Sequence, residues 1–388
     1  MSLPEDLIYR ILAFLDGALL ARCSCTCHAM KRLADEGLWA ACVTTKFGWL
    51  VGSCHADARA LFARMSDPTP KFVVVGVPSF LGAVGGMDGP QGAAYSYCPS
   101  SRAWAPFGLN LSPRNMPAVL RDRGGGLVVI GGTAFPSEAP TSHTYTTLHS
   151  VERFDGKHWR PLPPLQTARC CAGAASASEG RIFCVGGGES MYAASRAFAT
   201  VEFLEADTCL GHTPELQPWK FAPSMLDARC AHGCTIAHAT GHLYAVGGYG
   251  GEQRYLDTAE RLHLAGGGER WEPLPRLSCR RAGCTAAVGP DGRIYCVGGG
   301  PDGRTEHKSM EAYDARMCSW DTSLPSMSVG RHYNAAAWGP DGRLYVSGTY
   351  RHYGQLDVVE AFDLRAGRWE TLPQIGVVLQ FSAGAFIF

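Results

Sequence analysis

One arginine recurs in a similar setting at five places along the chain. These residues are Arg114, Arg169, Arg229, Arg281 and Arg331. A guanidinium group is a planar fork that binds a carboxylate or phosphate through two parallel hydrogen bonds. The repetition therefore has two interpretations: the five side chains bind an anionic ligand, or each of them holds loop carbonyls or an acidic neighbour within its own segment.

A second group with possible chemistry is the run of thiols and imidazole at Cys23, Cys25, Cys27 and His28. Structural zinc sites use pairs of ligands two to four residues apart. A run with one residue between successive thiols points its side chains around a helix, so we expect buried helix thiols and no metal. The histidines elsewhere occur singly, and the glycines at 124–126 lead into a strand pattern and not into a phosphate-binding helix.

Composition limits the class of protein. The chain has 388 residues, 47 of them glycine, with 46% hydrophobic residues and a net charge of zero. The apolar content excludes a disordered chain, and two domains are the natural expectation for this length. Neutrality gives no general attraction for nucleic acid or an anionic membrane, so we expect neither as a partner. The acidic start at Glu5 and Asp6 is unlike a secretory signal, and we expect an intracellular protein.

The first part of the chain has a helical pattern. Leu7, Ile8, Ile11, Leu12 and Leu15 have the spacing of an apolar stripe on one helix face. Two further short helical stretches follow before residue 45, and three such helices bury little surface on their own. The pattern predicts a small helical module that needs a partner.

From about residue 70 the pattern changes to short apolar strands that end in glycine. Diglycines end the strands at 127–132, 182–187, 243–248 and 294–299, and a fifth strand at 344–348 keeps one glycine. A tryptophan follows in each unit at an interval of 49 to 60 residues: Trp104, Trp159, Trp219, Trp271, Trp320 and Trp369. A Val-Glu or similar pair also recurs between them. The glycine and tryptophan series have the same period and therefore report one repeated unit.

These units resemble kelch repeats, and the resemblance covers residues 70–388. It implies a mainly β fold, a six-bladed kelch β-propeller with four strands in each blade. The first unit lacks an innermost strand, whereas the segment 381–388 is a spare one, so we expect the C-terminal strand to complete the first blade. In such a propeller the loops that carry the five arginines share one face with the loops of Tyr255, Arg304, Tyr350 and Tyr353. We expect this basic, aromatic surface to bind an acidic or phosphorylated peptide.

The N-terminal segment resembles an F-box, the helical module by which substrate receptors join a Skp-type adaptor. The residues that carry the likeness, and that would contact the adaptor, are Leu3, Pro4, Leu7, Ile8, Ile11, Leu12, Leu15 and Trp39. The stretch 25–30 departs from the family, with Met30 near the usual tryptophan. The alternative is that the apolar stripe packs on the propeller. The expected organisation is an F-box of three helices at 1–48, a linker at 49–69 and the propeller at 70–388.

Together the two resemblances imply a substrate-recognition subunit of a Skp-cullin-F-box ubiquitin ligase. Such a subunit has no catalytic residue and no cofactor; it binds the adaptor, and through it a cullin and a RING subunit, in the cytoplasm or nucleus. Two alternatives stay open. One is a kelch scaffold or cytoskeletal protein without a ubiquitin ligase role, and the other is a propeller enzyme of the galactose-oxidase kind, which needs clustered copper ligands.

Overall fold

The computed structural model divides the chain between Pro70 and Lys71. It describes residues 71–79, 93–99, 101–106, 114–134, 146–155, 158–190, 196–205, 217–264, 270–348, 358–373 and 378–387. The predicted three-helix F-box lies outside these residues. Within them the regular elements are strands, and no helix is long and apolar enough to span a membrane.

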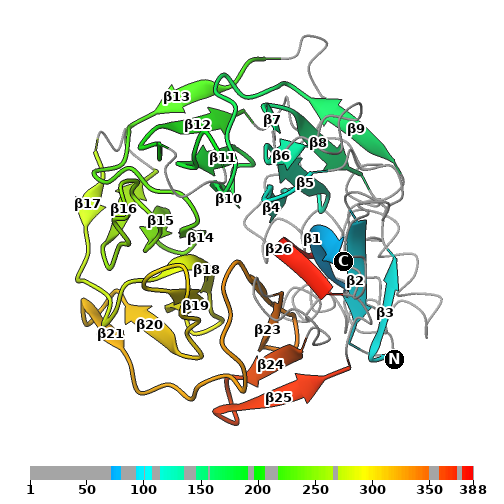
Figure 1. Cartoon of the computed structure of the whole chain (residues 1–388), viewed down its shortest axis with the longest axis vertical. Coiled ribbons are helices and arrows are strands. Elements are labelled where there is room, and N and C mark those ends of the chain that lie inside the picture. The colour runs from blue at the N-terminus through cyan, green and yellow to red at the C-terminus, as the bar shows by residue number, and fades with distance from the viewer. Residues whose placement is uncertain are drawn as a thin grey trace, which may run out of the picture. The chain divides into compact units, whose positions relative to one another are not determined.

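Six antiparallel sheets of four strands form a ring around a central channel (Figure 1). The predicted six-bladed propeller is therefore confirmed. The strands of each blade are given in order from the channel outward. Blade one consists of β26 (Val378–Ile387), β1 (Lys71–Ser79), β2 (Ala93–Cys98) and β3 (Ala103–Pro106), and blade two of β4 (Ala118–Arg121), β5 (Leu127–Ile130), β8 (Val151–Phe154) and β9 (Trp159–Leu162). Blade three consists of β10 (Gly173–Ser176), β11 (Ile182–Val185), β12 (Val201–Leu204) and β13 (Lys220–Ala222).

The other three blades repeat this order. Blade four consists of β14 (Gly233–Ala237), β15 (His242–Val246), β16 (Ala259–His263) and β17 (Glu272–Pro273). Blade five consists of β18 (Ala282–Val288), β19 (Ile294–Gly300), β20 (Met310–Asp314) and β21 (Ser319–Asp321), and blade six of β22 (Ala335–Trp338), β23 (Arg343–Ser347), β24 (Val359–Asp363) and β25 (Arg368–Leu372). A separate pair, β6 (Thr133–Ala134) and β7 (Thr146–Thr147), extends from blade two.

The hydrophobic cores lie between neighbouring blades. The second strands are buried along all or most of their length, completely in β5 and β11, because their two faces are covered by the sheets on either side. This explains the unbroken apolar runs before the diglycines, which are typical of strands buried on both faces. Six buried clusters fill the six spaces between blades, and each contains the tryptophan of one blade: Trp104, Trp159, Trp219, Trp271, Trp320 or Trp369.

Five of these tryptophans also donate a hydrogen bond to the preceding blade. The indole Nε1 of Trp271 is 2.9 Å from the Pro223 carbonyl oxygen in the blade before its own. Trp219, Trp320 and Trp369 each donate in the same way to a proline carbonyl oxygen of the blade before their own. Trp104 in blade one bonds to the Pro373 carbonyl oxygen of blade six at 3.0 Å. A repeated local contact therefore also joins the two ends of the ring.

The C-terminal strand completes the first blade, as the sequence predicted. β26 pairs antiparallel with β1, with Val74 opposite Gly384 and Lys71 opposite Ile387. In Figure 1 the red C-terminal strand lies beside the blue first strand at the channel. The pairing covers the inner edge of β1 and gives the first blade the same four-stranded sheet as the other five.

Deleting residues 378–388 should abolish cooperative unfolding of the propeller. The deletion leaves the β1 edge unpaired and uncovers Phe72, Val73 and Val74, whose side chains are fully buried in the intact ring. We expect the sigmoidal transition seen by circular dichroism on heating to become broad or disappear. A truncated chain that melts with unchanged cooperativity would show that the ring does not depend on this strand.

Candidate functional site

The five repeated arginines occupy equivalent positions, each just before the innermost strand of its blade. Their side chains are buried, with exposed fractions of 0 to 2%. Each guanidinium pairs with the repeated glutamate on the third strand of the same blade. The pairs are Arg114–Glu152, Arg169–Glu202 at 2.5 Å, Arg229–Glu260 at 2.5 Å, Arg281–Glu311 at 2.8 Å and Arg331–Glu360 at 2.9 Å.

Backbone carbonyls accept further hydrogen bonds from the Nη1 atoms of these guanidinium groups. In blade four, Arg229 Nη1 donates to the carbonyl oxygens of Gly247 at 2.6 Å and of Thr258 at 3.0 Å. Blade three repeats the arrangement from Arg169 to Gly186 and Thr200. The arginine thereby ties its entering loop to the second and third strands of the blade.

The glutamates are equally occupied by their own blades. Besides the guanidinium, Glu260 accepts the backbone N–H of Leu226 at 2.7 Å, in the loop that precedes Arg229. Glu202 accepts from Gln166 at 2.7 Å, Glu311 from Ser278 at 2.9 Å and Glu360 from Ser328 at 2.8 Å. Charge-assisted bonds to both partners offset the cost of burying the pair.

The prediction of an anion-binding ring at the channel mouth therefore needs correction. Arg114, Arg169, Arg229, Arg281 and Arg331 are at equivalent positions, but their charges are withdrawn from the surface and neutralised by carboxylates of their own blades. Of the two interpretations of the repetition, the structure favours the one in which each arginine holds loop carbonyls and an acidic neighbour.

The other predicted site residues divide between the loop face and segments outside the described residues. Arg304 is exposed on its loop, and Tyr255 is half-buried with its ring edge on Tyr249 at a centroid distance of 5.1 Å. Tyr350 and Tyr353 lie outside the described residues, as do all of the predicted adaptor contacts and the thiols at Cys23, Cys25 and Cys27.

Nearby exposed arginines on this face also have acidic partners. Arg254 lies 3.3 Å from Asp227, and Arg276 lies 2.5 Å from Asp257. Within the described loops the exposed positive charge is therefore partly balanced. Among the described residues, no three His, Cys, Asp or Glu side chains gather as ligands of a metal ion would.

Among the described residues, a partial ring of backbone hydrogen bonds links five blades around the channel. The residue two positions after each repeated arginine has a positive φ, between 50° and 68°: Met116, Cys171, Ala231, Gly283 and Tyr333. In this left-handed conformation each N–H of the last four donates to the carbonyl of the equivalent residue one blade earlier, at 2.7 to 3.1 Å. Non-glycine residues rarely adopt such a φ. The inter-blade bonds hold them there.

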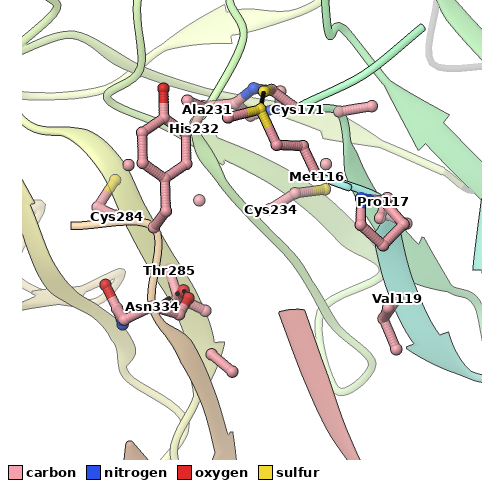
Figure 2. A pocket seen from close by; sticks show the side chains of 18 residues that line it. Met116, Pro117, Val119, Cys171, Ala231, His232, Cys234, Cys284, Thr285 and Asn334 are labelled. Atoms are coloured by element: carbon pink, nitrogen blue, oxygen red, sulfur yellow. Dashed lines mark hydrogen bonds between the residues drawn. The ribbon is translucent and has the colours of Figure 1, made fainter. Parts of the chain in front are cut away.

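The residue after each of these positions lines a cavity that sequence analysis did not identify. The cavity has a volume of about 120 Å³, and its walls come from the five blades that carry the arginines. Figure 2 shows His232 and Asn334 in its wall, with Cys171, Cys234, Cys284 and Met116. His232 is 6% exposed, and burial, with the positive Arg229 nearby, lowers the pKa of its imidazole to about 3.

Comparisons with known proteins agree with the two parts predicted from the sequence. Residues 1–44 match the F-box-like family model, and residues 230–278 match the model of the kelch motif. The chain thus combines an N-terminal segment that matches the F-box-like model with a six-bladed propeller that contains a match to the kelch motif, as predicted.

Two kinds of relative support the propeller. Human Kelch domain-containing protein 8B is 29% identical over 166 residues, or 40% of this chain and 43% of that protein, so the match spans less than half of the relative. The solved structure of YjhT covers 72% of this chain and 91% of its own, with a TM-score of 0.57 and 14% identity, which supports the fold alone. A copper-bound fungal alcohol oxidase aligns with a TM-score of 0.48 and 17% identity, too low a score to inform the chemistry.

Replacing a buried arginine should destabilise the propeller. Arg229→Ala leaves Glu260 buried without its cation, and we expect the free energy of unfolding to fall by about 3–5 kcal/mol. The matched variant Arg254→Ala removes an exposed partner of Asp227 and should cost less than about 1 kcal/mol. Urea unfolding measures both changes. Equal stability of the two variants would contradict a structural role for Arg229.

His232 should make the propeller sensitive to acid. The pKa of His232 is lowered from 6.5 to about 3 in the folded chain. Between these two pH values the imidazole is protonated in the unfolded chain and neutral in the folded chain. Stability should therefore fall as the pH drops from about 6.5 toward 3, by up to about 1.4 kcal/mol per pH unit from this residue.

Urea unfolding at pH 7 and pH 4.5 tests this effect. His232→Phe should lose less stability between the two pH values than the wild type, whereas His158→Phe, at an exposed position, should match the wild type. The same pH dependence in all three proteins would mean that the folded chain protonates His232 as readily as the unfolded chain does.

Proposed function

We propose that this chain is the substrate-recognition subunit of a Skp-cullin-F-box ubiquitin ligase. The observation that carries the proposal is the order of its two parts: an F-box-like match at 1–44 precedes a closed kelch propeller. In this arrangement the first part binds a Skp-type adaptor, which joins the chain to a cullin and a RING subunit. The expected site of action is the cytoplasm or nucleus.

The propeller is suited to hold a substrate protein in place. Its loops leave a rigid ring of six sheets, so side chains such as Tyr255 and Arg304 have fixed supports on one face. Tyrosine and arginine are enriched among the residues that dominate binding energies at protein interfaces. The repeated Arg–Glu pairs keep the loop backbones in register beneath this surface.

In this role the chain contributes proximity and not bond chemistry. A bound substrate lysine is held at a high effective concentration near the conjugating enzyme, which carries the ubiquitin. The ionisable groups that repeat in the propeller stabilise the blades, because each buried arginine forms an ion pair with a glutamate of its own blade. Transfer of ubiquitin would thus be carried out by partner subunits.

Adaptor binding should depend on the apolar stripe of the N-terminal segment. We expect Leu7→Asp combined with Leu12→Asp to reduce co-purification of a Skp-type adaptor at least tenfold, since a helix that docks through apolar contacts cannot bury two carboxylates. The matched control carries two aspartates in the propeller, at Phe221 and Leu226, which are 53% and 59% exposed. It should bind the adaptor as the wild type does.

The outcome separates the proposed function from its main alternative. If the Leu7 and Leu12 variant recovers as much adaptor as the wild type, or if the wild type recovers none, the chain is not a ligase subunit of this kind. A kelch scaffold without a ligase role would have an intact propeller but would recover no adaptor even as the wild type.

A further inference from the structure

Two histidines face each other across neighbouring strands of blade four. His242 begins β15 and His263 ends β16, and the antiparallel pairing of these strands places the two residues directly opposite each other (Figure 1). They lie beside the turn between β14 and β15, at the end of the blade that is remote from Arg229. In the sequence they are 21 residues apart, a spacing that indicates no metal site by itself.

The backbone pairing brings the two side chains as close together as a sheet allows. The N–H of Leu264 donates to the Gly241 carbonyl oxygen at 2.8 Å, so the ladder hydrogen bond falls on the neighbouring pair of residues. His242 and His263 therefore form a non-hydrogen-bonded pair, the kind in which side chains lie closest. Their ring centroids are 4.7 Å apart, and a Cβ on Gly241 would lie 3.7 Å from His263 Nε2. The two imidazoles thus converge on one place.

Both rings can offer a nitrogen to a ligand. His263 is exposed, and Nδ1 of the half-buried His242 has no hydrogen-bond partner among the described residues. Burial, with the positive Arg261 nearby, lowers the pKa of the His242 imidazole, so this ring is neutral at pH 7. Arg261 is itself paired with Glu272 at 3.0 Å, and the pair leaves little net charge to repel a cation.

Two imidazoles held side by side favour a transition-metal ion as the ligand. Imidazole is a preferred ligand of Zn²⁺, Cu²⁺ and Ni²⁺, whereas Mg²⁺ prefers oxygen. Two nitrogens bonded to one Zn²⁺ at about 2.0–2.1 Å lie roughly 3–3.5 Å apart. Rings with centroids 4.7 Å apart can reach this separation, because the exposed His263 ring is able to turn and admit the ion. An anion would gain less, since Arg261 is already paired.

We propose that His242 and His263 chelate one divalent transition-metal ion, such as Zn²⁺, at this end of blade four. Among the described residues no third His, Cys, Asp or Glu joins them in a metal-binding group, so water completes the coordination. The bound ion joins the start of β15 to the end of β16, next to the point where Tyr244 packs against Tyr313 of blade five. The site is independent of the proposed ligase role and of the central cavity.

Zinc binding can be followed at the two residues themselves. In ¹⁵N-histidine spectra of the full-length chain, Zn²⁺ should shift the imidazole signals of His242 and His263 together and saturably, because one ion contacts both rings. The variants His242→Gln and His263→Gln assign the signals, since each removes one of them. Mg²⁺ should leave both signals in place. The proposal is overturned if neither signal shifts saturably with Zn²⁺, or if Mg²⁺ has an equal effect.

Variants test whether the two rings act as a pair. His263→Gln should weaken Zn²⁺ binding at His242 at least tenfold, because the second imidazole no longer binds at a high effective concentration. The matched control is His158→Gln, at an exposed position before β9, which should keep the wild-type affinity. An unchanged zinc affinity at His242 in the His263 variant would refute chelation. If that variant fails to fold, the joint saturation of the two wild-type signals still decides.

Zinc bound elsewhere gives a different result in the same spectra. The chain has 16 cysteines, so its total zinc content does not test the pair. If zinc is held by thiols alone, the two imidazole signals do not move, and that result refutes the site. Adaptor co-purification is measured separately, so a failure of the ligase role and a failure of the histidine site are distinguishable.

Discussion

The propeller depends on a buried ion pair that is repeated in five blades. An arginine and a glutamate removed from water offset their lost hydration by their mutual attraction and by further hydrogen bonds to each of them. Here the guanidinium of Arg229 reaches Glu260 and two carbonyl oxygens, and Glu260 also accepts backbone N–H groups of the loop before Arg229. One pair thus fixes a loop and two strands, and the loss of either partner leaves a charge that the blade cannot hydrate.

The same arginine also explains the diglycines, because its backbone serves the neighbouring blade. The N–H of Gly187 donates to the Arg229 carbonyl oxygen at 2.9 Å, and Gly248 makes the equivalent bond to Arg281 at 2.7 Å. A Cβ on Gly186 would lie 2.3 Å from the Arg229 carbonyl oxygen, and φ there is +58°. Only glycine tolerates both the approach and the conformation. The side chain of each arginine therefore organises its own blade, and in the last four blades its carbonyl oxygen also accepts a hydrogen bond from the diglycine of the previous blade.

The sequence predicted much of the fold and less of the site, for a physical reason. Strands, diglycines and tryptophans repeat, so each blade confirms the interpretation of the others, and the spare C-terminal strand implied the closure. Repetition places Arg169 and Arg331 at equivalent positions but does not distinguish an exposed guanidinium from a buried one. The recurrence of a glutamate in the same five blades was the available signal for pairing. The polar wall residues His232 and Asn334 each occur once, and only the closed ring brings them to one cavity.

The architecture also determines where this propeller can acquire specificity. The arginine is fixed by its pair, and the residue two positions later is held in the left-handed ring of inter-blade hydrogen bonds. The next residue lines the cavity, and in the five blades it is Pro117, Ala172, His232, Cys284 or Asn334. Since neither the pair nor the ring uses these side chains, they can differ from blade to blade at little cost to the fold. The five arginine charges are neutralised by glutamates of their own blades, so the same pairs that order the loops add no net charge beside the cavity.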